Sequence, residues 1–352
     1  MPDLYFAVPG DLETRTGGYI YDRRLIAELR RLGWSVEPLA WSARFPFPDA
    51  ADLAAAARSL AALADRSLVL IDGLAYGAMP DVAAAEAARL DLVALVHHPL
   101  ARETGLSEAQ QQALAASERR ALQQARAVIC TSTTTARTLV ADYGIAASRV
   151  SVAPPGTDPA SPAQPVRAGS AVRLLSVGTM TPRKGHDLLV EALARLAGLA
   201  WHCTIAGSLD RHPAMAAEVR RRIAAHGLGD RIALAGEVAD MAGLYAAADL
   251  FVLPSRYEGY GMAFAEALQQ GLPVIGTTTG AIPEVVPPTA GLLVPPDDPP
   301  ALAAALQRLI GDPDERRRLA KGARRAAQGL PRWEDTARRV AAVLQGAGSR
   351  PI

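Results

Sequence analysis

Residues 251–268 read FVLPSRYEGYGMAFAEAL, a short apolar run followed by an acid, two glycines around a tyrosine, and a helix-like stretch. Glu258 and Glu266 lie eight positions apart within it. A buried strand that ends in an acid, glycines and a helix start is how an α/β sheet presents a polar, anion-tolerant pocket at the carboxyl edge of its strands. The segment therefore predicts a strand, a binding turn and a helix.

A second segment of the same kind lies upstream, LLSVGTMTPRKGHDLLVEAL at 174–193. Its apolar run breaks at Gly178, and a helix pattern resumes after Gly185. Arg183 and Lys184 stand between these glycines, where cations near a helix start oppose the helix dipole unless an anion binds. Cations suit a diphosphate and carboxylates suit hydroxyls, so the two segments together favour a nucleotide sugar as ligand.

Strand-like apolar runs alternate with helix patterns through both halves of the chain. This alternation with short breaks predicts parallel, doubly wound sheets, and each half resembles a Rossmann-type domain. The runs lie at 3–10, 67–73, 91–98 and 125–132 in the first half, and at 172–178, 201–207, 231–238, 250–255, 272–278 and 291–296 in the second.

Three regions follow from this reading of the chain. Residues 1–155 form the first domain, and a proline-rich stretch over 148–173 reads as the linker to a second domain at 170–330. Residues 331–352 contain the amphipathic pattern WEDTARRVAAVLQ with no strand before it, so we expect a helix that crosses back to the first domain. Two such domains would face each other across a shared ligand cleft.

The composition is that of a soluble globular protein, with 352 residues, 50% hydrophobic residues and a net charge of +1. No run approaches the roughly 18–20 apolar residues of a membrane span, and the N-terminus lacks signal-peptide features, so we expect a cytoplasmic protein. The neutral balance gives no support for nucleic-acid binding. Cys130 and Cys203 lie in strand-like runs without zinc spacing, so we expect buried, inert thiols.

The first domain offers two further candidate pairs. Gly17 and Gly18 stand between the first strand and the first helix, where they form either a flexible turn or a loop that faces the ligand. His97 and His98 directly follow the run DLVALV at the carboxyl end of a strand, which favours an active-site role for one of them. The sequence leaves open which of the two points inward.

Several other kinds of site are not indicated. Asp312-Pro313-Asp314 precedes a helix pattern and reads as a helix cap, so no metal site is predicted. In neither half does the turn after the first strand have the G-x-G-x-x-G form of a nicotinamide site. If all eight steps were helical, Glu258 and Glu266 would be about 12 Å apart at ~1.5 Å per residue, whereas a glycosidase pair needs about 5–9.5 Å.

The chain resembles the retaining glycosyltransferases of family 4, the group 1 glycosyltransferases with the GT-B fold. The family's E-x7-E signature falls on Glu258 and Glu266. Over the first half the resemblance is looser, and the PPGTD segment departs from the family's usual Asn-Gly-Val-Asp. The residues that carry the resemblance are GTMTPRKGHDLLVEAL (178–193), GEVADMAGLYAAADLFVLPSRYEGYGMAFAEALQQGLPVIGTTTGAIPEVV (236–286), GLLVPPDD (291–298) and the WED helix.

The resemblance implies a role for each candidate residue. Arg183 and Lys184 would bind the diphosphate, Glu266 the ribose hydroxyls, and Glu258 the transferred sugar. Further donor-side positions are Gly178, Val238 beside the base, and Gly259, Tyr260, Gly261 and Met262, of which the last three would supply backbone donors. In the first domain, Gly17 and Gly18 would form a mobile loop, and His97, with His98 as the rival, would be the active-site histidine.

The implied reaction moves a sugar from a nucleoside diphosphate to an acceptor hydroxyl with retention of anomeric configuration and without a metal or other cofactor. A non-catalytic nucleotide-sugar-binding protein of the same fold is the alternative. The acceptor would be a glycan, a lipid-linked glycan or a small molecule. The arginines at 316–318, 324–325 and 338–339 favour a solvated helix surface over peripheral contact with the inner face of a membrane.

Overall fold

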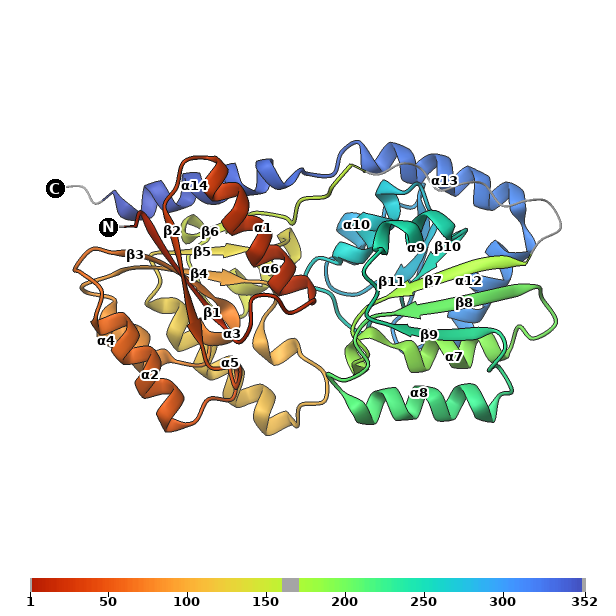
Figure 1. Cartoon of the computed structure of the whole chain (residues 1–352), viewed down its shortest axis with the longest axis horizontal. Coiled ribbons are helices and arrows are strands. Elements are labelled where there is room, and N and C mark those ends of the chain that lie inside the picture. Colours follow the sequence, from red (N-terminus) through yellow and green to blue (C-terminus); the bar gives the residue numbers. More distant parts are fainter. Residues whose placement is uncertain (1, 160–170, 350–352) are drawn as a thin grey trace. The chain divides into compact units, whose positions relative to one another are not determined.

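The computed structural model describes residues 2–159 and 171–349. The chain divides into two compact units, Met1–Gly156 with Pro331–Ile352, and Thr157–Leu330. Each unit contains one parallel sheet of six strands with helices packed on it (Figure 1). No helix in the described part of the chain is both long and apolar enough to span a membrane.

The first unit has the strand order β2-β1-β3-β4-β5-β6. Its central strand β4 is buried along its whole length, as expected for a parallel strand covered on both faces. The strands are β1 Leu4–Pro9, β2 Val36–Trp41, β3 Leu68–Asp72, β4 Asp91–Val96, β5 Ala127–Cys130 and β6 Val150–Val152. The helical segments are α1 Gly17–Arg31, α2 Ala50–Ala61, α3 Gly73–Tyr76, α4 Pro80–Glu86, η1 Leu100–Arg102, α5 Glu108–Gln123, α6 Thr133–Ala141 and η2 Ala147–Arg149.

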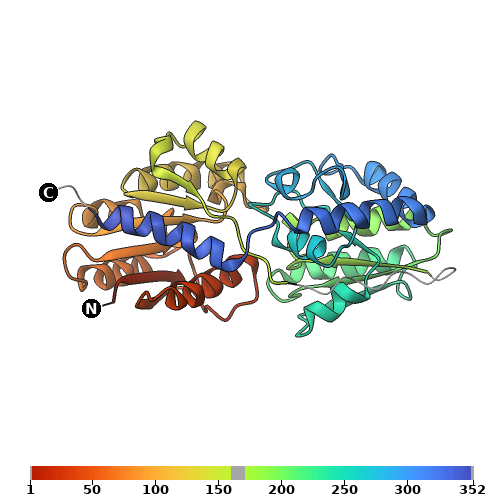
Figure 2. The ribbon, with the colours of Figure 1, turned by 90° about the horizontal axis from the view of Figure 1, so that it is seen from above.

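The C-terminal helix α14 (Trp333–Gly348) completes the first unit, although it follows the second in sequence. It contacts α1 and strands β3 to β5, and its course over this sheet is visible in Figure 2. The ring of Trp333 meets Tyr21 edge-on at 5.8 Å, and Thr336 donates a hydrogen bond to the Pro154 carbonyl at 2.7 Å. The amphipathic pattern of this helix is explained by the burial of one face against the first unit.

The second unit has the strand order β12-β11-β10-β7-β8-β9, and the six strands predicted in this half are confirmed. One face of the sheet packs on α7, α8 and α12, and the other packs on α9, α10 and α11, while α13 contributes Leu319 to the apolar cluster on the first face and Ala323 to the one on the second. The strands are β7 Val172–Val177, β8 Trp201–Ala206, β9 Ile232–Gly236, β10 Leu250–Val252, β11 Val274–Thr277 and β12 Gly291–Val294. The helical segments are η3 Pro182–Lys184, α7 His186–Ala194, α8 Pro213–Ala225, α9 Met241–Ala247, α10 Met262–Gln269, α11 Ile282–Val285, α12 Pro299–Gly311 and α13 Pro313–Ala327.

Two sequence expectations need correction. Gly17 and Gly18 form the first turn of α1 rather than a loop, since the N-cap is Thr16. The interpretation of 148–173 as linker was too broad, because Val150–Val152 pair with β5 as an edge strand and β7 begins at Val172. The middle of that stretch, 160–170, lies outside the described residues.

Two smaller expectations are confirmed. Asp312 caps α13 by accepting hydrogen bonds from the backbone N–H groups of Asp314 and Glu315. Cys130 and Cys203 are free thiols buried in β5 and β8. Burial raises the pKa of Cys203 to about 12, so this thiol stays protonated and inert at neutral pH.

Candidate functional site

The two segments singled out in the sequence meet at one edge of the second sheet. Strands β7 and β10 are parallel neighbours, with Leu174 opposite Leu250 and Leu175 opposite Phe251. The turns that follow them therefore leave the sheet side by side (Figure 1). We call the turn after β7, with Arg183 and Lys184, the cationic loop, and the turn after β10, with Glu258, the acidic loop. The two loops lie together because of this strand order.

Glu258 forms ion pairs with both cations of the cationic loop. Lys184 Nζ lies 2.6 Å from Glu258 Oε1, and a terminal nitrogen of Arg183 lies 3.3 Å from Oε2. The same Arg183 nitrogen donates to the Tyr257 carbonyl at 3.0 Å, and Ser255 Oγ donates to Glu258 Oε1 at 2.7 Å. Two cations thus converge on one carboxylate.

The charge state of Glu258 follows from these contacts. The residue is only 5% exposed, and burial alone would raise the pKa of its carboxyl group. The charges of Lys184 and Arg183, with hydrogen bonds from Lys184 and Ser255, outweigh burial and lower that pKa to about 2. Glu258 is therefore ionised at neutral pH, and it compensates part of the charge of the two cations.

Glycines allow the loops to approach this closely. A Cβ on Gly178 would lie 3.1 Å from Cγ and Cδ of Lys184, so the glycine leaves room for the lysine stem. Gly185 has φ +69°, and a Cβ there would lie 2.1 Å from the Pro254 carbonyl oxygen, which a side chain could not tolerate. The turn between β7 and α7 therefore requires glycine where it touches the turn after β10.

Arg256 is a residue of this site that the sequence analysis missed. Its backbone N–H donates to the Arg183 carbonyl at 2.7 Å, and its guanidinium also binds the Pro182 carbonyl. The guanidinium forms ion pairs with Asp187 at 2.9 Å and with Asp297 at 2.7 Å. Arg256 therefore holds the backbone of the cationic loop, and its place in the signature loop, two residues before Glu258, was the only available signal.

Glu266 occupies a separate position on α10. It is half-buried, and its Oε2 accepts a hydrogen bond from the Tyr245 hydroxyl at 2.7 Å. Burial raises the pKa of Glu266, and burial together with the Glu266 charge raises the pKa of Tyr245 well above its usual value. Glu266 therefore has a hydrogen-bond partner within the second unit.

The other donor-side candidates line the start of α10 or lie at other strand ends. Gly261 is the N-cap of α10 with φ +97°, and Met262 is the first residue of that helix. Gly259 and Tyr260 are buried in the turn after Glu258, and burial raises the pKa of Tyr260 to about 12. Val238 is half-buried just after β9.

His186 follows the cationic loop, but it packs in the protein interior and does not face a ligand. It is fully buried as the first residue of α7, and it provides no side-chain cap. Burial first, and then the charge of Lys184, lower the pKa of His186 to about 4, so the ring is neutral.

In the first unit, His97 and His98 both follow β4, but their surroundings differ. His97 Nε2 lies 3.2 Å from Asp22 Oδ1 and 3.1 Å from Asp72 Oδ2. His98 Nε2 lies 3.5 Å from Glu103, whose side chain is 43% exposed. His97 is thus the histidine with buried acidic partners, and a Cβ on Gly18 would lie 3.4 Å from its ring.

The contacts of His97 decide its charge. Burial alone would lower the pKa of His97, but the charges and hydrogen bonds of Asp22 and Asp72 outweigh it and raise that pKa to about 10. Asp22 and Asp72 were missed in the sequence because each is a single acid, Asp22 within α1 and Asp72 at the end of β3. One ligand atom from each of Asp22, Asp72 and His97 lies within 4.8 Å of the others, and Asp22 Oδ2 has no hydrogen-bond partner among the described residues, so these three residues are also the group in that part of the chain that could hold a metal ion.

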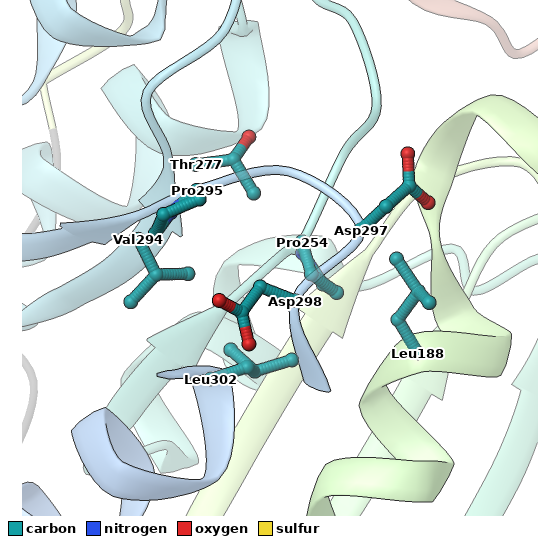
Figure 3. A pocket seen from close by; sticks show the side chains of 8 residues that line it. All are labelled: Leu188, Pro254, Thr277, Val294, Pro295, Asp297, Asp298 and Leu302. Atoms are coloured by element: carbon teal, nitrogen blue, oxygen red, sulfur yellow. The ribbon is translucent and has the colours of Figure 1, made fainter. Parts of the chain in front are cut away.

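A shallow pocket also opens in the second unit, at the carboxyl ends of β10, β11 and β12 (Figure 3). It contains none of the predicted site residues. Of its two acidic lining residues, Asp298 caps α12 and Asp297 pairs with Arg256, so both acids have structural partners. Its lining residues are Leu188, Pro254, Thr277, Val294, Pro295, Asp297, Asp298 and Leu302.

Family models match both units. The model described as "Glycosyl transferases group 1" matches residues 171–312, and the one described as "Glycosyltransferase Family 4" matches residues 16–161. The chain belongs to the family 4 glycosyltransferases. It is 28% identical over 329 residues to the MMP alpha-(1->4)-mannosyltransferase of Mycolicibacterium hassiacum, covering 88% of this chain and 78% of that enzyme.

Solved structures establish the fold of this family 4 glycosyltransferase. Sucrose-phosphate synthase from Thermosynechococcus elongatus matches with a TM-score of 0.83 and 24% identity, covering 97% of this chain and 98% of that one. Anabaena HepE in complex with UDP-glucose matches with a TM-score of 0.76 and 19% identity, covering 97% and 99%. The expected GT-B fold is confirmed.

Proposed function

We propose that this glycosyltransferase moves a hexosyl group from a nucleoside diphosphate sugar to an acceptor hydroxyl and retains the anomeric configuration. The observation that carries the proposal is the convergence of Lys184 and Arg183 on the buried Glu258 at the carboxyl edge of the second sheet. Retention is inferred from the family resemblance, and the donor class from the chemistry of this edge.

The two cations account for leaving-group stabilisation. As the bond to the sugar breaks, negative charge grows on the departing diphosphate, and preorganised donors aimed at that charge lower the barrier most. Lys184 offers a compact ammonium, and Arg183 offers a planar fork that can span two phosphate oxygens. Because Glu258 already orients both groups, they need little reorganisation when the diphosphate arrives.

Glu266 and Glu258 bind the hydroxyl groups of the donor. Glu266 is fixed through Oε2 by Tyr245, so its other oxygen is the one that accepts from the ribose. Glu258 contacts the transferred sugar, and the backbone from Tyr260 to Met262 supplies N–H donors at the start of α10. Val238 lies beside the base. The first unit binds the acceptor, and from it Gly17 and Gly18 also contact the donor, while His97 is the active-site histidine.

We propose that no divalent metal takes part in the transfer. The positive charges of Lys184 and Arg183 supply what a metal ion provides in other nucleotide-sugar enzymes. Full activity after exhaustive treatment with a chelator supports this proposal. Loss of activity that returns only when Mg²⁺ or Mn²⁺ is added contradicts it.

The acceptor is proposed by class only, as a glycan, a lipid-linked glycan or a small molecule. The arginines of α13 favour a solvated surface over membrane contact, since several are engaged locally. Arg317 pairs with Asp314, Arg318 pairs with Glu315, and Arg316 donates to the carbonyls of Leu309 and Ile310. A cytoplasmic location is proposed, and sedimentation with anionic vesicles tests the less favoured alternative, peripheral contact with a membrane.

The proposed reaction is tested with a panel of UDP and GDP sugars. Purified protein is incubated with each donor, with and without candidate acceptors, and nucleoside diphosphate release is measured. The proposal predicts release with one class of donor and an α-linked product from an α-linked donor, read by NMR of the anomeric proton. A protein that binds the donor but releases no nucleotide with any acceptor would instead be a non-catalytic binding protein.

A further inference from the structure

Two buried acids hold one imidazole in the first unit, and the proposed transfer does not yet use them. Asp22 comes from α1, Asp72 ends β3, and His97 follows β4. Asp22 and Asp72 are 1% and 2% exposed, and the side chain of His97 is 17% exposed. The three groups come from separate elements, so the fold itself brings them together.

Both acids contact the same ring atom. Asp22 Oδ1 lies 3.2 Å and Asp72 Oδ2 lies 3.1 Å from His97 Nε2. A lone pair on Nε2 would face two carboxylate oxygens and be repelled by both, so Nε2 carries the hydrogen. A single carboxylate on an imidazole fixes its tautomer, as in a Ser-His-Asp triad. The charges of both carboxylates outweigh the burial of the ring and raise the pKa of His97, while burial raises the pKa of Asp22 to about 7, so the full effect of the two acids develops above neutral pH.

The rest of the surroundings leave the ring positively charged. On α1, the Tyr21 ring meets His97 edge-on at 5.2 Å, and burial raises the pKa of Tyr21 far above neutral, so that phenol carries no charge. Directly after β5, Thr131 Oγ1 donates to the His97 carbonyl at 2.8 Å, which fixes the backbone. On α14, Trp333 covers Tyr21, and Arg24 lies over Trp333 at 5.4 Å.

We propose that Asp22 and Asp72 are positioning residues that hold His97 as an imidazolium, so that its Nδ1–H donates a hydrogen bond to a substrate oxygen and the ring does not act as a general base. The proposal rests on the glycosyl transfer proposed above. With Nε2 committed to the two acids, Nδ1 is the ring nitrogen left for substrate. A proton already on Nδ1 can be shared with a sugar or phosphate oxygen, but it prevents removal of a proton from the acceptor hydroxyl.

The first test reads the charge of His97 directly in the full-length protein. Imidazole ¹⁵N shifts are recorded from pH 6 to 10 and assigned by loss of one signal set in His97→Gln. We expect His97 to remain cationic at pH 8 in the wild type. In Asp22→Asn and Asp72→Asn its midpoint falls from about 10 to about 7 or below, so that His97 is mostly neutral at pH 8, and it falls further in the double variant. A neutral His97 at pH 7 in the wild type overturns the proposal.

The second test uses transfer rates. In either Asn variant we expect kcat to fall at least tenfold at pH 8 and to recover as the pH is lowered below the new His97 midpoint, because the imidazolium forms again. Asp91→Asn is the matched control, since Asp91 is 1% exposed at the opposite end of β4 and pairs with Arg126 at 2.6 Å. A loss that does not depend on pH, or that Asp91→Asn reproduces, contradicts a positioning role.

The two tests separate this proposal from the proposed function. If no sugar is transferred but His97 is cationic and responds to both substitutions, the arrangement of the acids stands and the transferase role fails. If transfer occurs while chelator treatment or added Zn²⁺ shifts the His97 signals, the acids share a metal rather than a proton. That result overturns the inference and leaves the transferase intact.

Discussion

Lys184 is the residue with the greatest expected effect on transfer. Its ammonium is held 2.6 Å from Glu258 in the position from which it would stabilise the leaving diphosphate. Lys184→Ala should lower kcat by about 10²–10³-fold, the usual cost of losing one donor to a developing anion. The measurement is steady-state release of nucleoside diphosphate from the preferred donor.

The control for this substitution is the other lysine of the chain. Lys321 is exposed on α13, away from the turns after β7 and β10. Lys321→Ala should leave both kcat and the melting temperature unchanged. Wild-type donor turnover in folded Lys184→Ala would contradict the assignment of the diphosphate site.

Tyr245 should affect donor binding more than chemistry. Its hydroxyl fixes Glu266 at 2.7 Å, so Tyr245→Phe should raise the donor KM about tenfold with little change in kcat, equivalent to about 1.4 kcal/mol for a lost hydrogen bond to a carboxylate. Measuring wild type and Tyr245→Phe with the donor and with its 2′-deoxy analogue gives a double-mutant cycle, which isolates the coupling between the phenol and the ribose hydroxyl. If the phenol acts through Glu266, the variant should discriminate less between the ribose and deoxyribose donors than the wild type does. Equal discrimination would argue against this role.

Sequence reasoning singled out the residues proposed to bind the donor but not the acids of the first unit, and the reason is physical. Arg183, Lys184 and Glu258 lie in turns directly after strands, where a local pattern marks the binding edge. Asp22 lies within a helix, and its relation to His97 depends on how α1 packs beside β4. Only tertiary packing reveals that pair. The choice between His97 and His98 was open for the same reason.

At the level of elements, the turn between β7 and α7 depends on Gly185. An alanine there would need φ +69° and a Cβ 2.1 Å from a backbone oxygen of the turn after β10. The strained conformation alone costs of order 1–3 kcal/mol, and the clash adds to it. Gly185→Ala should therefore lower the free energy of unfolding by at least that amount in urea, and it should weaken donor binding because Lys184 directly precedes Gly185 within this turn.

The matched control is Gly198→Ala. Gly198 is exposed, and a Cβ on it would meet no atom within 4 Å. This substitution should change the free energy of unfolding by less than about 0.5 kcal/mol. If Gly185→Ala behaved like Gly198→Ala, the close approach of the two turns would not be needed for the site.

The elements of the second unit were predictable because each of its strands is a short apolar run followed by a helix pattern. The first unit was harder. Strand β2 has the burial pattern of an exposed edge strand, with only Val36 fully buried, and β6 is a three-residue edge strand beside prolines. Edge strands bury less apolar surface, so they leave a weaker periodic signal, and both β2 and β6 lay outside the runs identified from the sequence.

At the scale of the whole molecule, the donor should stabilise one unit selectively. All the donor-side residues except Gly17 and Gly18 belong to the unit Thr157–Leu330. A donor at 100-fold its Kd should raise the free energy of unfolding of the binding-competent form by about 2.7 kcal/mol. Hydrogen exchange should show slower exchange first in the segments 178–193 and 253–270, because the proposed phosphate and ribose contacts lie there.

Variants decide whether this protection reports the proposed site. Lys184→Ala should abolish most of it, whereas Asp22→Asn should preserve it in 253–270, since Asp22 belongs to the other unit. Protection confined to residues 1–156 would place the nucleotide in the wrong half and contradict the assignment of the cationic loop. Protection in both units that survives in Lys184→Ala would mean that binding energy comes mainly from the sugar and the base, and that the diphosphate contributes little.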